Sequence, residues 1–127
     1  MIDITNGLLT INSELMFYPG YKFDDFKKTK YYKGQNDVRG IYLKDMQDID
    51  GKHYLVNFFF INRRIYVVSL INCDYEISEE YEYKRKTIHD NILAKDKIRS
   101  AHQYEWGKVD SEYDARSNIS SINIYYN

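Results

Sequence analysis

The sequence is poor in cysteine, in proline and in long apolar runs. It has one cysteine, Cys73, among 127 residues, so an internal disulfide is impossible and a cysteine-based zinc site is not expected. The first residues lack the basic and then apolar stretches of a secretion signal, and no apolar run approaches the roughly 18 residues of a membrane span. We therefore expect a soluble, cytoplasmic protein that does not associate with membranes.

The sequence also has no excess of positive or of negative charge. Lys and Arg total 18 and Asp and Glu total 19, which leaves a net charge of −1. The chain has no overall field that would hold a phosphate backbone, so nucleic acid is not an expected partner. The six glycines are isolated, without the spacing of a phosphate-binding loop.

The three histidines, His53, His89 and His102, fall in different segments and show no ligand-like spacing. We predict that they are surface residues, and we expect no metal or other cofactor. The length and the ordinary share of hydrophobic residues, 43%, predict a single domain spanning residues 1–127.

Turn residues divide the first third of the chain. Asn6–Gly7 is the strongest short hairpin signal in the sequence, because a type I′ turn needs positive φ at both central residues. It predicts a hairpin of residues 2–5 and 8–11. Residues 23–32, FDDFKKTKYY, begin with acids and end with lysines, which predicts a short helix.

Residues 39–72 are rich in β-branched and aromatic side chains. They predict three antiparallel strands, at 39–46, 53–61 and 65–72. A two-residue loop at Asn62–Arg63 would place the following pairs opposite each other: Phe60 with Ile65, Phe58 with Val67, Tyr54 with Ile71. Both faces of this hairpin are apolar, so we expect at least partial cover on both. Arg63 is an unfavourable residue for positive φ, which leaves the turn type open.

Residues 77–95 predict the main helix. Ser78 is a suitable N-cap, acids precede bases, and a narrow apolar stripe is formed by Tyr81, Ile88 and Ile92. Together these elements predict an α+β fold with an antiparallel sheet, in the order ββ-α-βββ-α-ββ, and with helical cover mainly on one face.

The C-terminal segment predicts a last hairpin. With a four-residue loop at 114–117, Val109 pairs with Ile122 on a core face, because a slip of one residue would mix apolar and polar positions. The same register makes Trp106 and Tyr125 neighbours on the opposite face. The polar residues beside them are Lys108, Asp110, Ser121 and Asn123.

Few residues in the sequence could act in catalysis, and no catalytic signature is present. Cys73 stands beside Asp74, which disfavours a thiolate, so we predict an inert side chain. The segment from Asp114 to Ser117 joins an acid, a base and a hydroxyl, but turn formation explains all three. An enzyme is therefore the less favoured interpretation; it would be hydrolase-like and would use a pocket around His102, Asp114 and Arg116.

The Trp106–Tyr125 pair has two interpretations. The rings could close a minor core under the N-terminal segment, as large aromatics commonly do. Alternatively they stay exposed and anchor a protein partner, with Lys108, Asp110 and Asn123 as a polar rim, because aromatic anchors with a polar rim are typical of protein-binding surfaces.

Three segments carry a resemblance: WGKVDSEYDARSNISSINIYY, FDDFKKTKYY and DGKHYLVNFFFINRRIYVVSLI. They look similar to small bacterial proteins, some of which resemble immunity proteins of polymorphic toxin and contact-dependent inhibition systems. The resemblance implies a stand-alone cytoplasmic binder that acts by occupying a site on its partner. The favoured hypothesis is thus a small protein-binding module with a protein partner; an immunity-type inhibitor of a cognate toxin is the specific form that the resemblance implies. A structural or regulatory subunit is a third interpretation.

Overall fold

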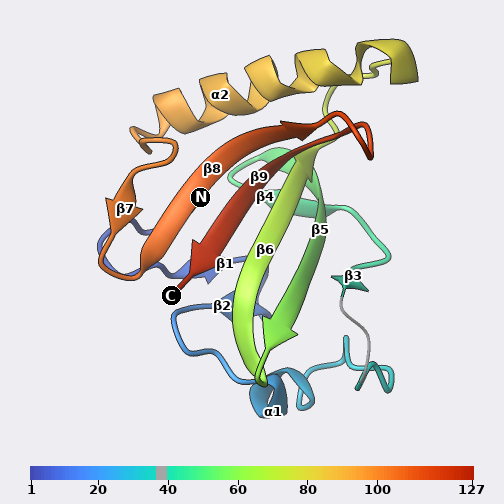
Figure 1. Ribbon diagram of the computed structural model, residues 1–127. Helices are drawn as coiled ribbons and strands as arrows, with labels where there is room; N and C mark the ends of the chain where they lie inside the picture. Colours follow the sequence, from blue (N-terminus) through green and yellow to red (C-terminus); the bar gives the residue numbers. More distant parts are fainter. Residues whose placement is uncertain (37–39) are drawn as a thin grey trace.

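The computed structural model describes residues 1–36 and 40–127 and has an α+β fold with an antiparallel sheet, which confirms the predicted class (Figure 1). The elements follow the chain in this order: β1 (Leu9–Thr10), β2 (Met16–Phe17), α1 (Phe23–Phe26), β3 (Ile41–Tyr42), β4 (Gln47–Ile49), β5 (Lys52–Ile61), β6 (Arg64–Asn72), the 3₁₀ helix η1 (Glu79–Lys84), α2 (Arg85–Lys95), β7 (Gln103–Tyr104), β8 (Gly107–Asp114) and β9 (Ile119–Tyr126). The short strands β4 and β7 were not expected.

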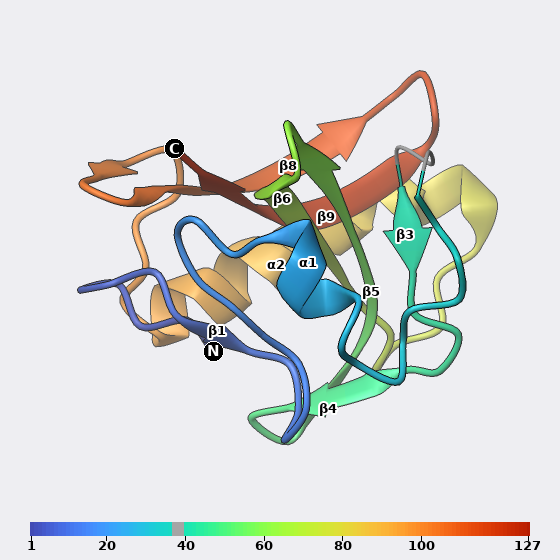
Figure 2. The ribbon, with the colours of Figure 1, turned by 90° about the horizontal axis from the view of Figure 1, so that it is seen from below.

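One antiparallel sheet organises the molecule. Its strands lie in the order β3-β5-β6-β9-β8-β7, with β4 also paired to β5, while β1 and β2 form a separate small sheet. The helices and the small sheet lie on one side of the main sheet, and within residues 1–36 and 40–127 no helix or second sheet covers its other side (Figure 2). Among the residues described, no helix is both long and apolar enough to cross a membrane.

The predicted N-terminal hairpin is wrong in its register. Residues 2–5 do not pair with 8–11 along their length; only Ile2 and Leu9 form a bridge, and the ladder forms instead between β1 and β2. The reason lies at the turn, where Gly7 alone has positive φ and its N–H donates to the carbonyl of Asp3. The turn is therefore wider than a two-residue type I′ turn.

The β5–β6 hairpin turns at Asn62 and Arg63, as predicted, and both have positive φ. Three contacts of Arg63 offset the conformational cost of its positive φ. Its guanidinium donates a hydrogen bond to Asp24 at 2.6 Å and lies 5.0 Å from the centroid of the Phe23 ring. Its carbonyl accepts the Phe23 N–H. Helix α1 thereby fixes the turn, although it is much shorter than the predicted 23–32.

A β-bulge changes the register beyond the first pairs. Phe60 faces Ile65 as predicted, but Phe59 then faces Val67, which leaves Tyr66 as the extra residue. The predicted pairs of Phe58 with Val67 and Tyr54 with Ile71 are therefore wrong; their partners are Val68 and Asn72. Arg39, the first residue of the predicted strand 39–46, lies outside the described residues.

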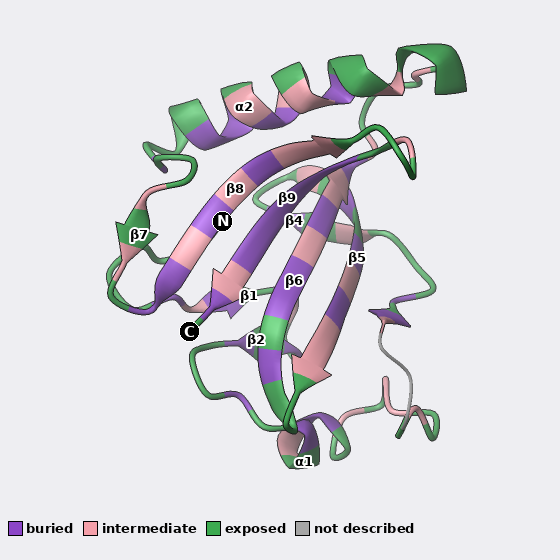
Figure 3. Cartoon of the chain, viewed as in Figure 1, coloured by how far each residue is buried: buried purple, intermediate pink, exposed green. Residues whose placement is uncertain are grey.

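Helix α2 packs on β6, β8 and β9 through a face that includes Ile92 of the predicted stripe, but its other buried residues were not predicted (Figure 3). Its buried residues are Arg85, His89, Ile92 and Leu93, whereas Tyr81 is exposed and Ile88 only partly buried. Residues 79–84 form a 3₁₀ helix with three residues per turn. A stripe predicted from 3.6 residues per turn therefore does not place Tyr81 on the same face as the residues of α2.

The β8–β9 hairpin has a four-residue loop, but it spans residues 115–118 rather than 114–117. Val109 consequently pairs with Ile124, and Ser111 with Ile122. The register differs from the predicted one by two residues, so each side chain keeps its predicted face, and Val109 and Ile122 are both buried in the core. Asp114 stabilises the loop by accepting the Arg116 N–H and the Ser117 hydroxyl.

Trp106 lies on the core side under the N-terminal segment, which confirms the first of the two interpretations for this ring, and the exposed pair with Tyr125 is wrong. It sits in the tight turn between β7 and β8 and is only 6% exposed. Its ring stacks on Tyr104 at 5.5 Å, and its Nε1 donates to the Ile4 carbonyl at 2.8 Å. A Cβ on Gly7 would lie 2.7 Å from this ring, so glycine there lets the N-terminal segment close over it.

Candidate functional site

The uncovered side of the main sheet presents two rows of side chains that cross the strands. Residues that pair directly share a face. In the first row each residue pairs with the next across the sheet, in the order Tyr42, Asn57, Ser69, Asn123, Asp110. In the second row the order is Phe59, Val67, Tyr125, Lys108. We call this surface the open face; it consists of these two rows together with Leu55, Ile61, Tyr66, Glu112, Asp114, Ile119 and Ser121.

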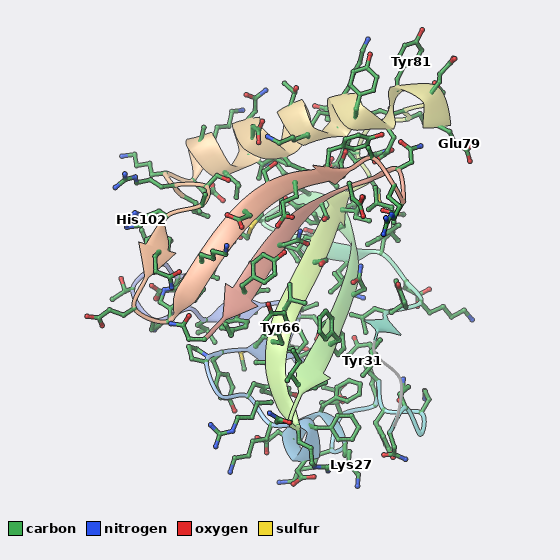
Figure 4. The ribbon with its side chains drawn as sticks, in the orientation of Figure 1. Lys27, Tyr31, Tyr66, Glu79, Tyr81 and His102 are labelled. Carbon is green, nitrogen blue, oxygen red and sulfur yellow. The ribbon has the colours of Figure 1, made fainter. Side chains whose placement is uncertain are left out.

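Three aromatic rings gather at the centre of the open face. Tyr66, the extra residue of the β-bulge, lies 5.3 Å from the Phe59 ring and 5.8 Å from the Tyr125 ring, measured between centroids. A bulge re-aims a side chain relative to regular strand alternation. Figure 4 shows Tyr66 standing on β6 on the side away from the small sheet.

Hydrogen bonds fix the polar residues around these rings. The Tyr125 hydroxyl donates to Glu112 at 2.8 Å, and the Ser69 hydroxyl donates to Asn123 at 2.6 Å. Burial first, and then the bond to Glu112, raise the pKa of Tyr125, so its hydroxyl stays protonated and remains a donor. The centre of the open face is therefore ordered before any ligand arrives.

Lys108 and Asp110 form an ion pair beside the rings. Lys108 Nζ lies 3.2 Å from one oxygen of Asp110 and 5.3 Å from the centroid of the Tyr125 ring. The other oxygen of Asp110 is buried without a hydrogen-bond partner among the residues described. A cation thus already rests on the π-face of Tyr125, the arrangement favoured by the ring quadrupole.

A hollow of about 450 Å³ opens on this face. Its lining combines the three rings with two carboxylates and several small polar groups: Phe59, Tyr66, Val67, Ser69, Glu112, Asp114, Ser117, Ile119, Ser121, Asn123 and Tyr125. Aromatic walls with a few oriented polar groups are typical of ligand sites.

Large hydrophobic side chains are exposed at several places on the open face, and two of them, Tyr66 and Ile119, line the hollow. Tyr42 is 74% exposed, and four further residues of the open face expose between 38% and 46%: Leu55, Ile61, Tyr66 and Ile119. Single exposed apolar residues are ordinary, but a contiguous group rimmed by polar residues marks an interaction surface. The expected partial cover on both faces of the β5–β6 hairpin holds at Val67, which is buried, and at Phe59, which is half-buried, but it is wrong at Leu55, Ile61 and Tyr66.

The structure brings together four of the five residues predicted to bind a partner. Tyr125, Lys108, Asp110 and Asn123 lie side by side on the open face, and Trp106 does not. Sequence reasoning missed Phe59 and Tyr66, which it assigned to a covered face. Polar Asn57 and Ser69, which interrupt two apolar strands on this same face, were the available signal.

The residues of the alternative enzyme site lie apart. His102 packs against Tyr104 near β7, where Gln103 pairs with Lys108, whereas Asp114 ends β8. From Lys108 to Asp114 the strand extends roughly 20 Å at about 3.3 Å per residue. Asp114 and Arg116 are in contact, because the Asp114 carboxylate accepts the backbone N–H of Arg116. His102 lies too far away to share a pocket with them.

A second hollow, also of about 450 Å³, lies beside α2. Asp74 at its wall accepts hydrogen bonds from Asn72 at 2.9 Å and contacts His53 Nδ1 at 2.9 Å. These contacts lower the pKa of Asp74 and raise that of His53. Asp74 therefore already has a basic side-chain partner, whereas among the residues described neither Glu112 nor Asp114 has one at ion-pair distance.

The prediction that His89 is a surface residue is wrong. Its ring is fully buried between α2 and the sheet, and its Nε2 accepts the backbone N–H of Asn72 at 3.0 Å. Arg85 lies in the same interface, donating to the Asn72 carbonyl and to Glu82. Burial, and then the charge of Arg85, lower the pKa of His89 to about 4.

Cys73 is half-buried and its thiol donates to the Ile71 carbonyl at 3.2 Å. Within residues 1–36 and 40–127, no group of three or more His, Cys, Asp or Glu side chains is placed to hold a metal ion. Comparison of the chain with protein-family models, with curated proteins and with solved structures finds no match.

Proposed function

We propose that this chain is a small protein-binding module whose contact surface is the open face. The observation that carries the proposal is the set of exposed hydrophobic residues on the open face together with its three central rings, in a sheet whose other side carries the helices and the small sheet. Aromatic anchors surrounded by a polar rim are where binding energy concentrates in protein interfaces.

The charges of the open face favour a partner with a basic contact surface. Strand β8 places Asp110, Glu112 and Asp114 on this face, and Lys108 is the only base that strand β8 adds there. Complementary charge speeds encounter and selects the partner. The resemblance to immunity proteins suggests its identity: a bacterial toxin, which the module inhibits by covering the toxin's own site.

The experiment is capture of partners from an extract of the native host, with the open face altered. The double variant Ile61→Ser/Tyr66→Ser removes two exposed anchors, and Tyr81→Ser/Tyr83→Ser is the matched control, with equally exposed rings on η1. Truncating such anchors typically costs about 2 kcal/mol or more, roughly a thirtyfold loss of affinity. We expect the open-face variant to lose the partner and the control to keep it.

The toxin assignment has its own test. The chain is co-expressed with the product of a neighbouring toxin gene, and growth is measured with the unaltered chain and with both double variants. Rescue by the unaltered chain and the control, but not by the open-face variant, supports the proposal. Equal partner capture by all three forms, with thermal melts showing them all folded, refutes the open face as the contact surface.

A further inference from the structure

We infer that the hollow on the open face binds a cationic side chain, an arginine, presented by the protein partner. This inference rests on the proposed function and adds the chemistry of the contact. It follows from the combination of three ring faces and two carboxylates in one hollow, and from the contacts that those groups make.

The two carboxylates lack cationic partners. Among residues 1–36 and 40–127, neither Glu112 nor Asp114 lies within ion-pair distance of a basic group, and no Lys or Arg lines the hollow. Glu112 uses one oxygen to accept the Tyr125 hydroxyl and has a second oxygen left. Asp114 is kept ionised, because hydrogen bonds from the loop 115–118 lower its pKa.

The rings provide π-faces for the same cation. Tyr66 and Tyr125 meet at 69°, an edge-on arrangement in which this contact covers at most one face of either ring, and Phe59 extends the wall beside Tyr66. Lys108 shows that the Tyr125 ring accepts a cation in this protein. A guanidinium can stack on a ring and bond a carboxylate in its own plane, which a compact ammonium cannot do as well.

The size of the hollow agrees with one side chain and its neighbouring backbone. About 450 Å³ lies near the lower end of the range for small-ligand sites. The exposed residues around it, such as Ile119 and Ile61, can pack against the apolar part of the partner. The arginine thus acts as the anchor, and the rest of the open face excludes water around it.

The test uses small probes on the intact protein and needs no knowledge of the partner. N-acetyl-arginine amide is titrated and followed by NMR shifts of the β8 and β9 amides, with N-acetyl-citrulline amide as the neutral control of the same shape. We expect saturable binding of the arginine probe, with a dissociation constant on the order of 1 mM for so small a ligand. We expect the citrulline probe to bind at least about tenfold more weakly, because it lacks the charge.

Two variants locate the site. Glu112→Gln removes a charge but keeps an acceptor for the Tyr125 hydroxyl, and Tyr66→Leu removes a ring but keeps an apolar side chain. Each should weaken the arginine probe by roughly tenfold. Glu79→Gln and Tyr81→Leu, exposed on η1 and not part of the lining of the hollow, are the matched controls and should leave it unchanged (Figure 4).

Failure of this inference can be distinguished from failure of the proposed function. If both probes bind equally or not at all, or if the arginine probe is insensitive to Glu112→Gln and Tyr66→Leu, the cation site is refuted. Partner capture that is still lost in Ile61→Ser/Tyr66→Ser would then leave the protein-binding function standing. Conversely, selective arginine binding together with partner capture that ignores the open face would refute the proposed function alone.

Discussion

Lowering the pH from 7 to 4.5 is expected to destabilise the protein through one buried histidine, His89. The ring is fully buried, and its Nε2 accepts the Asn72 N–H, so this nitrogen must be unprotonated in the folded state. Protonation of Nε2 would direct the new N–H of the ring at the backbone N–H of Asn72. Arg85 nearby adds a positive charge that disfavours protonation, and the charges of Glu82 and Asp90 act in the opposite direction.

The magnitude follows from the difference in proton affinity between the two states. The pKa of His89 is about 4 in the folded protein, against an ordinary value of 6.5. Below pH 6.5 the unfolded chain binds a proton that the folded chain does not, so stability falls as the pH falls, down to about pH 4. At about 1.4 kcal/mol per tenfold difference the full loss is about 3 kcal/mol, of which ~2.5 kcal/mol is reached by pH 4.5.

The assay is urea unfolding at pH 7, 5.5 and 4.5 of the unaltered chain and of His89→Gln, whose amide oxygen can still accept the Asn72 N–H. Subtracting the free energy of unfolding of the variant from that of the unaltered chain at each pH cancels the contributions of other titrating groups. One of these is His53, whose stabilising contact with Asp74 is lost as the pH rises through the raised pKa of His53. We expect the variant to gain ~2.5 kcal/mol relative to the unaltered chain on going to pH 4.5.

The matched control is Leu93→Ala on the same buried face of α2. It should lose about 2–5 kcal/mol by leaving a cavity, and lose the same amount at every pH. A difference between the unaltered chain and His89→Gln that does not change between pH 7 and pH 4.5 would refute the buried neutral histidine.

Three further predictions concern residues outside the helix interface. Trp106→Ala should lower the free energy of unfolding by about 3–5 kcal/mol, because its ring is core; an unchanged urea midpoint would contradict this. Gly107→Ala should lower the melting temperature strongly, since φ is 150° and a Cβ would overlap the Tyr125 carbonyl; a melt within a degree or two of the unaltered chain would show that the turn adapts. Cys73 should react with thiol reagents far more slowly in the native state than in urea, and Cys73→Ser should retain partner capture; rapid native labelling at neutral pH would restore the nucleophile hypothesis.

Local sequence chemistry predicted a large part of the fold. The turn at Asn62–Arg63 and the faces of β8 and β9 follow from turn residues and from alternation, and alternation survives a register error of two residues because it has a period of two. For the same reason Lys108, Asp110, Asn123 and Tyr125 were placed on one surface correctly.

Trp106 shows where such reasoning stops. Alternation assigned it to the face of Tyr125, but the tight turn before Gly107 directs the ring to the core, where it stacks on Tyr104 and bonds the Ile4 carbonyl. Nothing adjacent in sequence reveals a partner that lies about a hundred positions away.

The sequence by itself therefore determined the fold class, the strand faces and the membership of much of the open face, because these depend on local conformation and on the period of the side chains. Tertiary structure decided three other things: that a bulge in the pairing of β5 with β6 brings Tyr66 beside Phe59 and Tyr125, that His89 is buried, and that one face of the sheet stays uncovered. The last two depend on how α2 and the N-terminal segment pack against one side of the sheet. Such packing is set by contacts between residues distant in the chain, which periodicity and turn chemistry do not encode.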